Sequence, residues 1–361
     1  MKHLIDPTDL TREETDDIIA LAEDIISHRE NYNERCKGKK LATLFYEPST
    51  RTRLSFTAAM MELGGNVLGF ADARSSSVSK GETVEDTVRV VGCFADIIAM
   101  RHHIEGAPLA AIEVSNVPII NAGDGSHSHP TQTLTDLLTI KRELGHLDNL
   151  TIGFCGDLRF GRTVHSLIKA MSRYEGTRVI LIAPDELRLP DYIKHDVCDC
   201  NDIEYREVNS MEEVMGELDV LYMTRVQKER FLDEEEFDLI KNSFILDNQK
   251  LKTAKEKMAI LHPLPRVNEI LKEVDSDPRA AYFRQVENGK FVRMALICRL
   301  LDWQNDSEHT MPVYQNTNID TTLYRCPNQK CICNNENVEI RFHKAENGTI
   351  RCFYCETKAR K

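Results

Sequence analysis

The chain has 361 residues, of which 41% are hydrophobic and 29% are charged, so it can build two or three ordinary globular cores. Its 46 Lys and Arg against 58 Asp and Glu give a net charge of −12, which argues against a nucleic-acid partner. No apolar run suits a membrane span, and the N-terminal residues lack the apolar core of a signal peptide, so we expect a cytoplasmic protein. The eleven cysteines then indicate free thiols and metal ligands rather than disulfides.

The first predicted elements lead into a candidate anion site. An amphipathic helix over 9–29 precedes a buried strand over 41–45, which Pro48 ends. Helix N-termini attract anions, and the segment Ser49-Thr50-Arg51-Thr52-Arg53 adds hydroxyl and guanidinium donors at the expected start of a helix. This pattern predicts a phosphate-binding turn, and the alternative is an ordinary capped helix whose arginines face solvent.

The same segment resembles the carbamoyl-phosphate loop of the aspartate and ornithine carbamoyltransferases, so Ser49, Thr50, Arg51 and Thr52 are expected to bind phosphate. After a second strand over 66–70 comes a serine-rich stretch over 71–80, which by itself is typical of a solvated loop. In that family such a loop carries a Ser and a Lys into the active site of the neighbouring subunit. The resemblance assigns these roles to Ser76 and Lys80, with Ser75 and Ser77 left open as alternatives, and implies a homotrimer with shared sites.

Two motifs follow at the ends of the next predicted strands. Arg101-His102-His103 comes after a strand over 96–100, at the carboxyl end where open α/β sheets bind ligands. We interpret the two histidines as surface residues. His129-Pro130-Thr131-Gln132 comes after a strand over 117–121 and resembles a second family motif. The resemblance implies that His129 and Gln132 hold the carbamoyl group, while Thr52, Arg101 and His129 stabilise negative charge on its oxygen.

The middle of the chain alternates predicted strands and helices, which indicates a second parallel, doubly wound sheet. A helix over 131–144 leads into it, and the strands are expected over 150–155, 179–183, 219–223, 244–247 and 259–261. Glycines after the first of these strands do not complete a dinucleotide fingerprint.

Strand ends in this second half again carry candidate ligands. The resemblance implies that Arg162, Arg225 and Gln227 bind the carboxylates of aspartate. It also implies that the backbone of Leu264 and Pro265 contacts the carbamoyl amide, and that Glu47 and Arg230 bridge the two domains.

The acceptor is expected to be aspartate, because a dicarboxylate requires forked cationic donors whereas ornithine does not. Ornithine enzymes also typically show His-Cys-Leu-Pro where this chain has His262-Pro263-Leu264-Pro265. The resemblance thus implies transfer from carbamoyl phosphate to L-aspartate, the committed step of pyrimidine biosynthesis, without a covalent intermediate or a catalytic cofactor. A transferase for another amine such as ornithine, and an inactive binding paralogue, are the alternatives.

The C-terminal residues carry a metal-site pattern. A CxxxxC pair and a CxxC pair, with strand-like residues over 338–342 and at 350, predict tetrahedral zinc held by Cys326, Cys331, Cys352 and Cys355. We interpret Cys333 and His343 as bystanders. The segment resembles the zinc domain of the regulatory chain of some bacterial aspartate carbamoyltransferases. The nucleotide-binding domain that normally precedes it has no counterpart, so we expect no nucleotide-effector control.

These patterns predict an α/β fold with two doubly wound parallel-sheet domains of the carbamoyltransferase type and a small β zinc domain. The resemblance implies a carbamoyl-phosphate domain over 1–133 and 288–304, to which a helix predicted over 292–303 returns. The aspartate domain is expected over 134–287, a linker over 305–322 and the zinc domain over 323–361.

Overall fold

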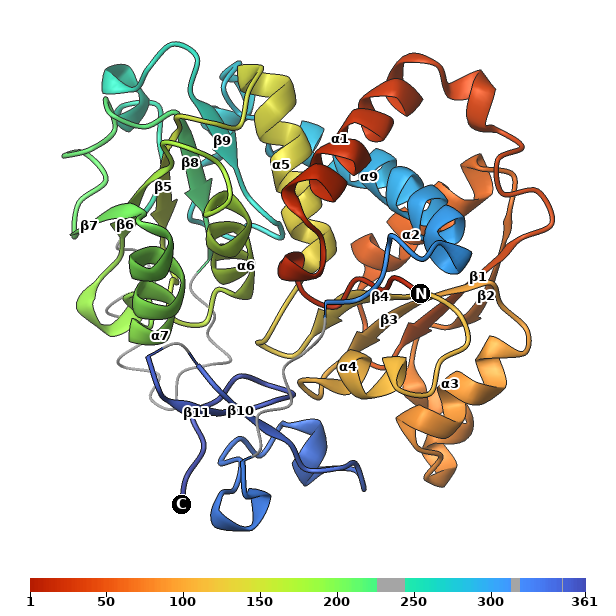
Figure 1. Ribbon diagram of the computed structural model, residues 1–361. Helices are drawn as coiled ribbons and strands as arrows, with labels where there is room; N and C mark the ends of the chain where they lie inside the picture. Colours follow the sequence, from red (N-terminus) through yellow and green to blue (C-terminus); the bar gives the residue numbers. More distant parts are fainter. Residues whose placement is uncertain (226–243, 313–318, 346) are drawn as a thin grey trace. The chain divides into compact units, whose positions relative to one another are not determined.

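The structure is a computed structural model that describes residues 1–225, 244–312, 319–345 and 347–361 (Figure 1). It divides into two compact units, one formed by 1–134 with 289–361 and the other by 135–288. Each unit contains one parallel sheet. Among the described residues, none of the helices combines the length and apolar character that crossing a membrane requires.

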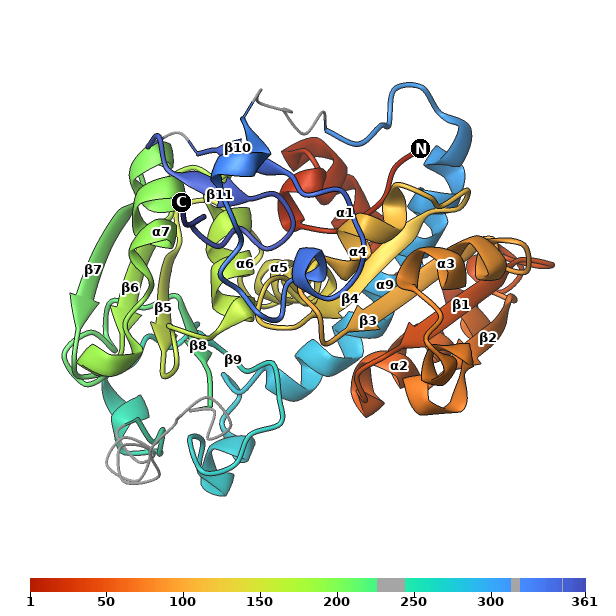
Figure 2. The ribbon, with the colours of Figure 1, turned by 90° about the horizontal axis from the view of Figure 1, so that it is seen from below.

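The first unit is built on a four-stranded parallel sheet of order β2-β1-β3-β4. Its central strands are nearly continuous apolar runs, as expected for strands covered on both faces. Helices α2 and α9 cover one face of this sheet, and α3 and α4 cover the other (Figures 1 and 2). The elements are β1 (Lys40–Phe45), β2 (Asn66–Phe70), β3 (Ile97–His102), β4 (Ile119–Asp124), α1 (Arg12–Ser27), α2 (Thr50–Glu62), α3 (Val84–Gly92), α4 (Ala107–Ile112) and α9 (Tyr282–Asp302). Residues 282–288 of α9 belong to the second unit.

The second unit is built on a five-stranded parallel sheet of order β7-β6-β5-β8-β9. Helix α5 (Pro130–Leu144) begins in the first unit and continues into this one. The other elements are β5 (Thr151–Cys155), β6 (Arg178–Ile182), β7 (Glu204–Val208), β8 (Val220–Met223), β9 (Ala259–Leu261), α6 (Arg162–Met171) and α7 (Asp191–Ile193).

Both sheets reverse their strand order once. In the first sheet β2 lies on one side of β1 and β3 on the other, so the reversal falls between β1 and β3. In the second sheet the reversal falls between β5 and β8 for the same reason. Ligands in open α/β sheets bind at the carboxyl ends of the strands at such a reversal, so each unit has one geometrically favoured site.

The C-terminal segment forms an antiparallel pair, β10 (Phe342–Lys344) and β11 (Ile350–Cys352), and belongs to the first unit. Its residues share one hydrophobic cluster with α3, α4 and the face of the sheet that these helices cover. Gly106, which precedes α4, has φ +80°, and a Cβ there would lie 2.5 Å from the Cβ of Tyr354. The dark blue segment accordingly lies against α4 (Figure 2).

Most predicted elements are present, and the exceptions have clear reasons. The predicted strand over 244–247 is wrong, because only Leu246 pairs, in an isolated bridge to Ile270. Strand β7 was not predicted, because it is an edge strand with polar, half-exposed residues. Helix α9 starts ten residues before the predicted position 292. The strand predicted over 338–342 instead begins at Phe342.

The interpretation of His102 as a surface residue is also wrong. It is 2% exposed and packs against Tyr46, with ring centroids 4.3 Å apart and the ring planes inclined by 44°. Burial, followed by the neighbouring His103, lowers the pKa of His102 to about 3, so the imidazole is neutral in the folded chain. Its Nδ1 accepts a hydrogen bond from the Ile104 N–H at 2.9 Å, which shapes the chain after β3.

Candidate active site and metal centre

The predicted phosphate turn lies at the start of α2, directly after β1. Ser49 is the N-cap residue, but its side chain makes no capping hydrogen bond. Its hydroxyl instead bonds to the hydroxyl of Thr52 at 3.1 Å, and Thr50 and Arg51 are exposed in the same turn. The Ser49 side chain therefore does not cap the first N–H groups of α2. These groups lie at the helix N-terminus, where the helix dipole favours an anion.

Arg101 approaches this turn from β3, across the strand reversal. It pairs in register with Phe45, and its carbonyl accepts the Tyr46 N–H at 2.8 Å. Its side chain is 11% exposed, and its Nη2 lies 2.7 Å from Oε2 of Glu47. Its Nη1 donates to the Ala122 carbonyl at 3.3 Å.

The electrostatics of Arg101 favour a negatively charged ligand. Burial and the nearby charge of Arg51 lower the pKa of Arg101, and Glu47 only partly opposes them. Among the described residues its buried Nε has no hydrogen-bond acceptor. Arg51, on the helix after β1, and Arg101, on β3, thus present more donors at the strand reversal than Glu47 satisfies.

His129 lies at the end of a loop that follows β4, the neighbour of β3. The loop is organised by Asp124, which is fully buried and accepts hydrogen bonds from Asn121, Gly106 and Ser128. Although burial raises it, the pKa of Asp124 is lowered overall by His127 and these hydrogen bonds. His129 is 6% exposed at the start of α5, with Gln132 in the first turn.

Ser76 and Lys80 lie in two short 3₁₀ turns after β2. The Ser76 hydroxyl donates to the Ala73 carbonyl at 2.8 Å and accepts the Val78 N–H at 3.3 Å. Lys80 is exposed, and Gly81 with φ +92° turns the chain toward α3. The assignment of these two residues to a neighbouring subunit's site remains a prediction.

Arg162 and Arg225 lie at the strand reversal of the second sheet. Arg162 is the first residue of α6, which follows β5, and Arg225 is two residues past the adjacent strand β8. Thr224 joins the two strand ends, because its hydroxyl accepts the Asp157 N–H at 2.9 Å and donates to the Cys155 carbonyl at 3.0 Å. The second sheet thus brings two arginines to adjacent strand ends, and both are half-buried. The predicted Gln227 and Arg230 lie outside the described residues.

Leu264 and Pro265 follow β9 in the same sheet. Their peptide bond is cis, and Leu264 has φ +51°, in the left-handed region that residues with a Cβ rarely adopt. The Leu264 N–H donates to Nδ1 of His262 at 2.7 Å, while the other ring nitrogen contacts Glu269 at 2.7 Å. The histidine thereby fixes the turn that presents the Leu264 backbone.

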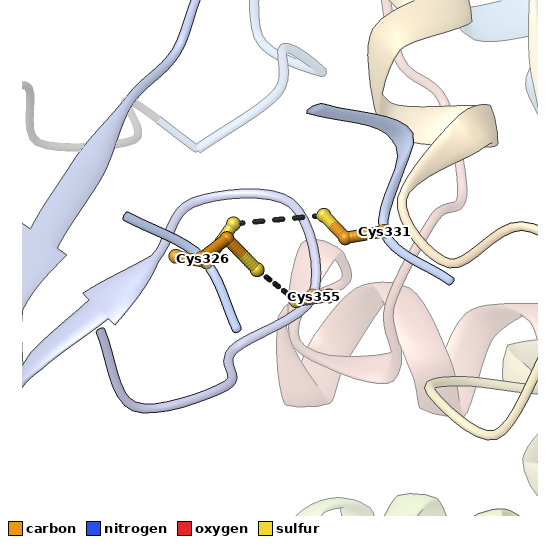
Figure 3. Close-up of side chains that lie close together, drawn as sticks. Cys326, Cys331 and Cys355 are labelled. Carbon is orange, nitrogen blue, oxygen red and sulfur yellow. Dashed lines mark hydrogen bonds between the residues drawn. The ribbon is translucent and has the colours of Figure 1, made fainter. Parts of the chain in front are cut away.

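The four predicted cysteine ligands converge in the C-terminal segment. All four are buried, and their sulfur atoms lie within 4.8 Å of one another. Figure 3 shows Cys326, Cys331 and Cys355 meeting from separate stretches of the chain. A tetrahedral zinc with Zn–S bonds of about 2.3 Å places its ligands about 3.8 Å apart. The separations of 3.6 Å for Cys326–Cys355 and 3.7 Å for Cys331–Cys352 match that geometry.

The two expected bystanders differ. His343 pairs with Glu356 at 2.8 Å. Cys333 lies beside two of the ligands, with its sulfur 3.3 Å from that of Cys331 and 4.0 Å from that of Cys352.

Sequence reasoning missed the residues that support these sites. Glu105 joins the metal segment to the loop before His129. Asp136 on α5 and Gln285 on α9 are hydrogen-bonded to each other, and Gln285 connects them to the turn at Leu264. Each is a buried polar side chain inside or beside a helix. A polar residue within an otherwise amphipathic pattern was the only available signal, and it does not reveal a partner more than 100 positions away.

Comparison with known proteins covers nearly all of the chain. Residues 2–142 match the family model for the carbamoyl-phosphate-binding domain of aspartate/ornithine carbamoyltransferases, and 148–300 match its Asp/Orn-binding domain. Residues 318–361 match the metal-binding domain of the aspartate carbamoyltransferase regulatory chain.

Similar proteins agree with these matches. The aspartate carbamoyltransferase catalytic subunit of Lachnoclostridium phytofermentans is 64% identical over 84% of this chain and 98% of its own length. That of Clostridium acetobutylicum is 62% identical over 83% and 98%. Among solved structures, the catalytic subunit of M. jannaschii aspartate transcarbamoylase has a TM-score of 0.79 at 47% identity, covering 85% of this chain and 99% of its own.

The Trypanosoma cruzi aspartate transcarbamoylase, solved with N-(phosphonacetyl)-L-aspartic acid, has a TM-score of 0.78 at 40% identity over 82% and 95% of the two chains. The chain therefore belongs to the aspartate carbamoyltransferase family, and it carries a metal-binding domain of the regulatory-chain type in the same polypeptide as the catalytic domains.

Proposed function

We propose that this chain transfers the carbamoyl group of carbamoyl phosphate to the amine of L-aspartate, giving N-carbamoyl-L-aspartate and phosphate, in pyrimidine biosynthesis. One observation carries the proposal: each sheet presents two arginines at the point where its strand order reverses. Arg51 and Arg101 do so in the first unit, and Arg162 and Arg225 in the second. The two reactants, an acyl phosphate and a dicarboxylate, each require such a cationic site.

The phosphate binds at the start of α2. Backbone N–H groups and the hydroxyls of Ser49, Thr50 and Thr52 donate to its oxygens, and Arg51 adds a forked cation. A phosphate of this kind is the leaving group, so donors that bind it more tightly as its negative charge grows accelerate departure.

The carbonyl oxygen of the carbamoyl group gains negative charge when the amine attacks. Thr52, Arg101 and His129 donate to that oxygen, and Gln132 with the backbone of Leu264 and Pro265 holds the amide nitrogen. Removing one donor of this type typically slows turnover about 100- to 1000-fold. The Arg101 guanidinium, which is 11% exposed, acts in a poorly solvated environment where such a donor is strongest.

The aspartate carboxylates bind Arg162, Arg225 and Gln227, which leaves the amine directed at the carbonyl carbon. A C–N bond forms, the C–O bond to phosphate breaks with its electron pair going to the phosphate, and the departing phosphate takes up the proton that the amine loses. Fixing two reactants in this orientation supplies about 7–11 kcal/mol of the barrier, so no protein nucleophile is required. The acceptor named for the T. cruzi relative, solved with carbamoyl phosphate and aspartate, supports this assignment.

The assembly and the metal complete the proposal. The enzyme is a cytoplasmic homotrimer in which Ser76 and Lys80 enter the site of a neighbouring subunit. Zinc binds Cys326, Cys331, Cys352 and Cys355 as thiolates and crosslinks the C-terminal segment, with no part in the transfer. Metal analysis is expected to find about one zinc per chain, and a Cys352→Ser variant is expected to lose it.

An acceptor assay tests the function. Purified chain is incubated with carbamoyl phosphate and either L-aspartate or L-ornithine, and carbamoylated product is measured. We expect product with aspartate alone. Activity with ornithine alone would transfer the assignment to the other branch of the family, and no product with either acceptor would overturn the proposal.

Variants of Arg51 test the phosphate site. Arg51→Ala is expected to lose at least about 100-fold in turnover without loss of folding, because it removes charge and fork together. Arg51→Lys retains the charge and is expected to lose less. Equal, near-normal activity in both variants would show that this turn does not bind the phosphate.

A further inference from the structure

A chain of buried hydrogen bonds in the second unit runs from α5 to the turn after β9. We propose that Asp136, Gln285 and His262, here called the Asp136 relay, position the Leu264 backbone for the transfer reaction. These residues touch no reacting atom in the proposed mechanism, so they are positioning residues. The inference rests on the proposed function for its kinetic consequence, whereas its geometric consequence can be measured separately.

The first links join two helices. Asp136, on α5, is 0% exposed, and its Oδ1 accepts a hydrogen bond from Nε2 of Gln285 at 2.6 Å. Gln285, on α9, is 1% exposed, and its Oε1 accepts the His262 N–H at 2.9 Å. Since an unpaired polar group at this depth is destabilising, each residue restricts the orientation of the next.

The last link fixes the protonation of His262. Its Nδ1 accepts the Leu264 N–H, so this nitrogen carries no proton, and Nε2 carries the proton that it donates to Glu269. Glu269 in turn accepts the N–H groups of Val267 and Asn268 at 3.0 and 3.1 Å. The imidazole is therefore held in one tautomer and one orientation.

Leu264 requires this support. At φ +51° a residue with a Cβ is strained, and such a conformation persists only where surrounding contacts impose it. The hydrogen bond to His262 is the contact that acts directly on the Leu264 amide. Loss of that bond lets Leu264 relax toward negative φ and rotates its peptide groups away from the carbamoyl amide.

The other oxygen of Asp136 extends the relay to the aspartate side. Its Oδ2 accepts the Tyr222 hydroxyl at 3.0 Å, and Tyr222 lies on β8, three residues before Arg225. Burial, followed by the charge of Asp136, raises the pKa of Tyr222, so the phenol remains a donor. One carboxylate thus braces two of the strand ends that hold substrate in the proposed mechanism, those of β8 and β9.

Two substitutions of His262 separate positioning from general packing. In His262→Asn the amide oxygen takes the place of Nδ1 and can still accept the Leu264 N–H. In His262→Gln the amide takes the place of Nε2 and cannot. We expect His262→Gln to lower kcat/KM for carbamoyl phosphate about tenfold more than His262→Asn, as loss of one buried hydrogen bond predicts. The KM for aspartate is expected to be similar in both.

Amide hydrogen exchange, read at residue resolution by mass spectrometry, gives the geometric test. In the wild-type chain the Leu264 amide is expected to exchange slowly, and its exchange is expected to accelerate in His262→Gln but not in His262→Asn. Gln285→Met, which keeps the histidine and removes its backbone partner, is expected to show intermediate exchange. This variant serves if the histidine variants fail to fold.

The outcomes distinguish the two proposals. A wild-type chain without transferase activity but with a protected Leu264 amide would overturn the proposed function and leave the relay in place. An active wild-type chain whose Leu264 amide exchanges freely would overturn the relay, as would equal kinetic losses in folded His262→Gln and His262→Asn.

Discussion

The contact between Glu105 and the metal segment allows a quantitative test of how firmly that segment is held. Glu105 is 8% exposed, and one carboxylate oxygen accepts the Ser126 N–H at 3.0 Å while the other accepts Nδ2 of Asn328 at 2.6 Å. Its backbone also pairs with the first cysteine knuckle, donating to Lys330 at 2.8 Å and accepting from Ile332 at 3.0 Å. Glu105→Ala removes the two side-chain bonds and leaves the two backbone bonds.

The expected cost follows from charge and burial. Only the bond to Asn328 reaches the metal segment, because the bond to Ser126 stays within the catalytic domain. A hydrogen bond to a buried charged group contributes about 1.5–3 kcal/mol, so its loss favours opening of the segment by about that amount. Glu113 offers a matched control, because it also contacts the segment, through Arg341 at 3.2 Å, but its side chain is 43% exposed. A solvent-exposed ion pair of this kind contributes between about 0 and 1 kcal/mol.

Metal release measures the difference. A chelator added to the metal-loaded chain is expected to reach the cysteines only when the metal segment separates from α4. The rate of metal release therefore reports the opening equilibrium of the segment. Glu105→Ala is expected to accelerate release at least about tenfold, the equivalent of about 1.5 kcal/mol, and Glu113→Ala less than about fivefold. Equal acceleration by the two variants would refute the reasoning, because burial would then have no influence on the contact.

Three further predictions concern sharing of the site, the β5–β8 junction and acid stability. Mixed Lys80→Ala and Arg51→Ala chains, each inactive alone, are expected to recover activity through hybrid sites, and no recovery would contradict a shared site. Gly156→Ala places a Cβ 2.3 Å from a backbone oxygen at a residue with φ +110°, so it is expected to raise the KM for aspartate. Gly145→Ala is the control for backbone strain alone, because Gly145 has φ +88° and open space around the added Cβ. Burial lowers the pKa of His165 to about 4, so the unfolded chain binds a proton below about pH 6.5 that the folded chain excludes until about pH 4. The contribution of His165 to the free energy of unfolding is therefore retained above pH 6.5 and falls by about 2 kcal/mol by pH 5. Urea unfolding should show a smaller loss of stability between pH 7 and 5 in His165→Gln than in the wild-type chain. An unchanged loss would contradict the assignment.

The sequence was most informative where burial and local pattern coincide. The strand over 66–70 and the strand over 259–261 have the predicted bounds, because apolar runs between turn residues suit a sheet covered on both faces. The turn at Ser49 was equally clear, since a proline, a hydroxyl pair and a helical pattern stand together. The cysteine ligands were found because a metal requires a fixed spacing in the chain.

Prediction failed where a residue's environment is set by distant parts of the chain. His102 was expected at the surface because its charge state is not visible in the sequence, and burial against Tyr46 makes it neutral. The start of α9 was missed because Gln285 and Asn288, both 1% exposed, are polar residues that face inward. Their partners lie on α5, about 149 positions away, and no local period encodes such a pairing.

The position of the metal segment within the first unit has a consequence for stoichiometry. A module on a separate chain is held at a partner by its concentration, and it leaves on dilution. Here the metal segment is covalently joined to the catalytic domains, so its local concentration stays in the millimolar range whatever the amount of protein in the cell. A modest interface around α4 is therefore enough to keep the segment in contact with the first unit. Every copy of the transferase is therefore made with one such module, and neither dilution nor unequal synthesis can remove it.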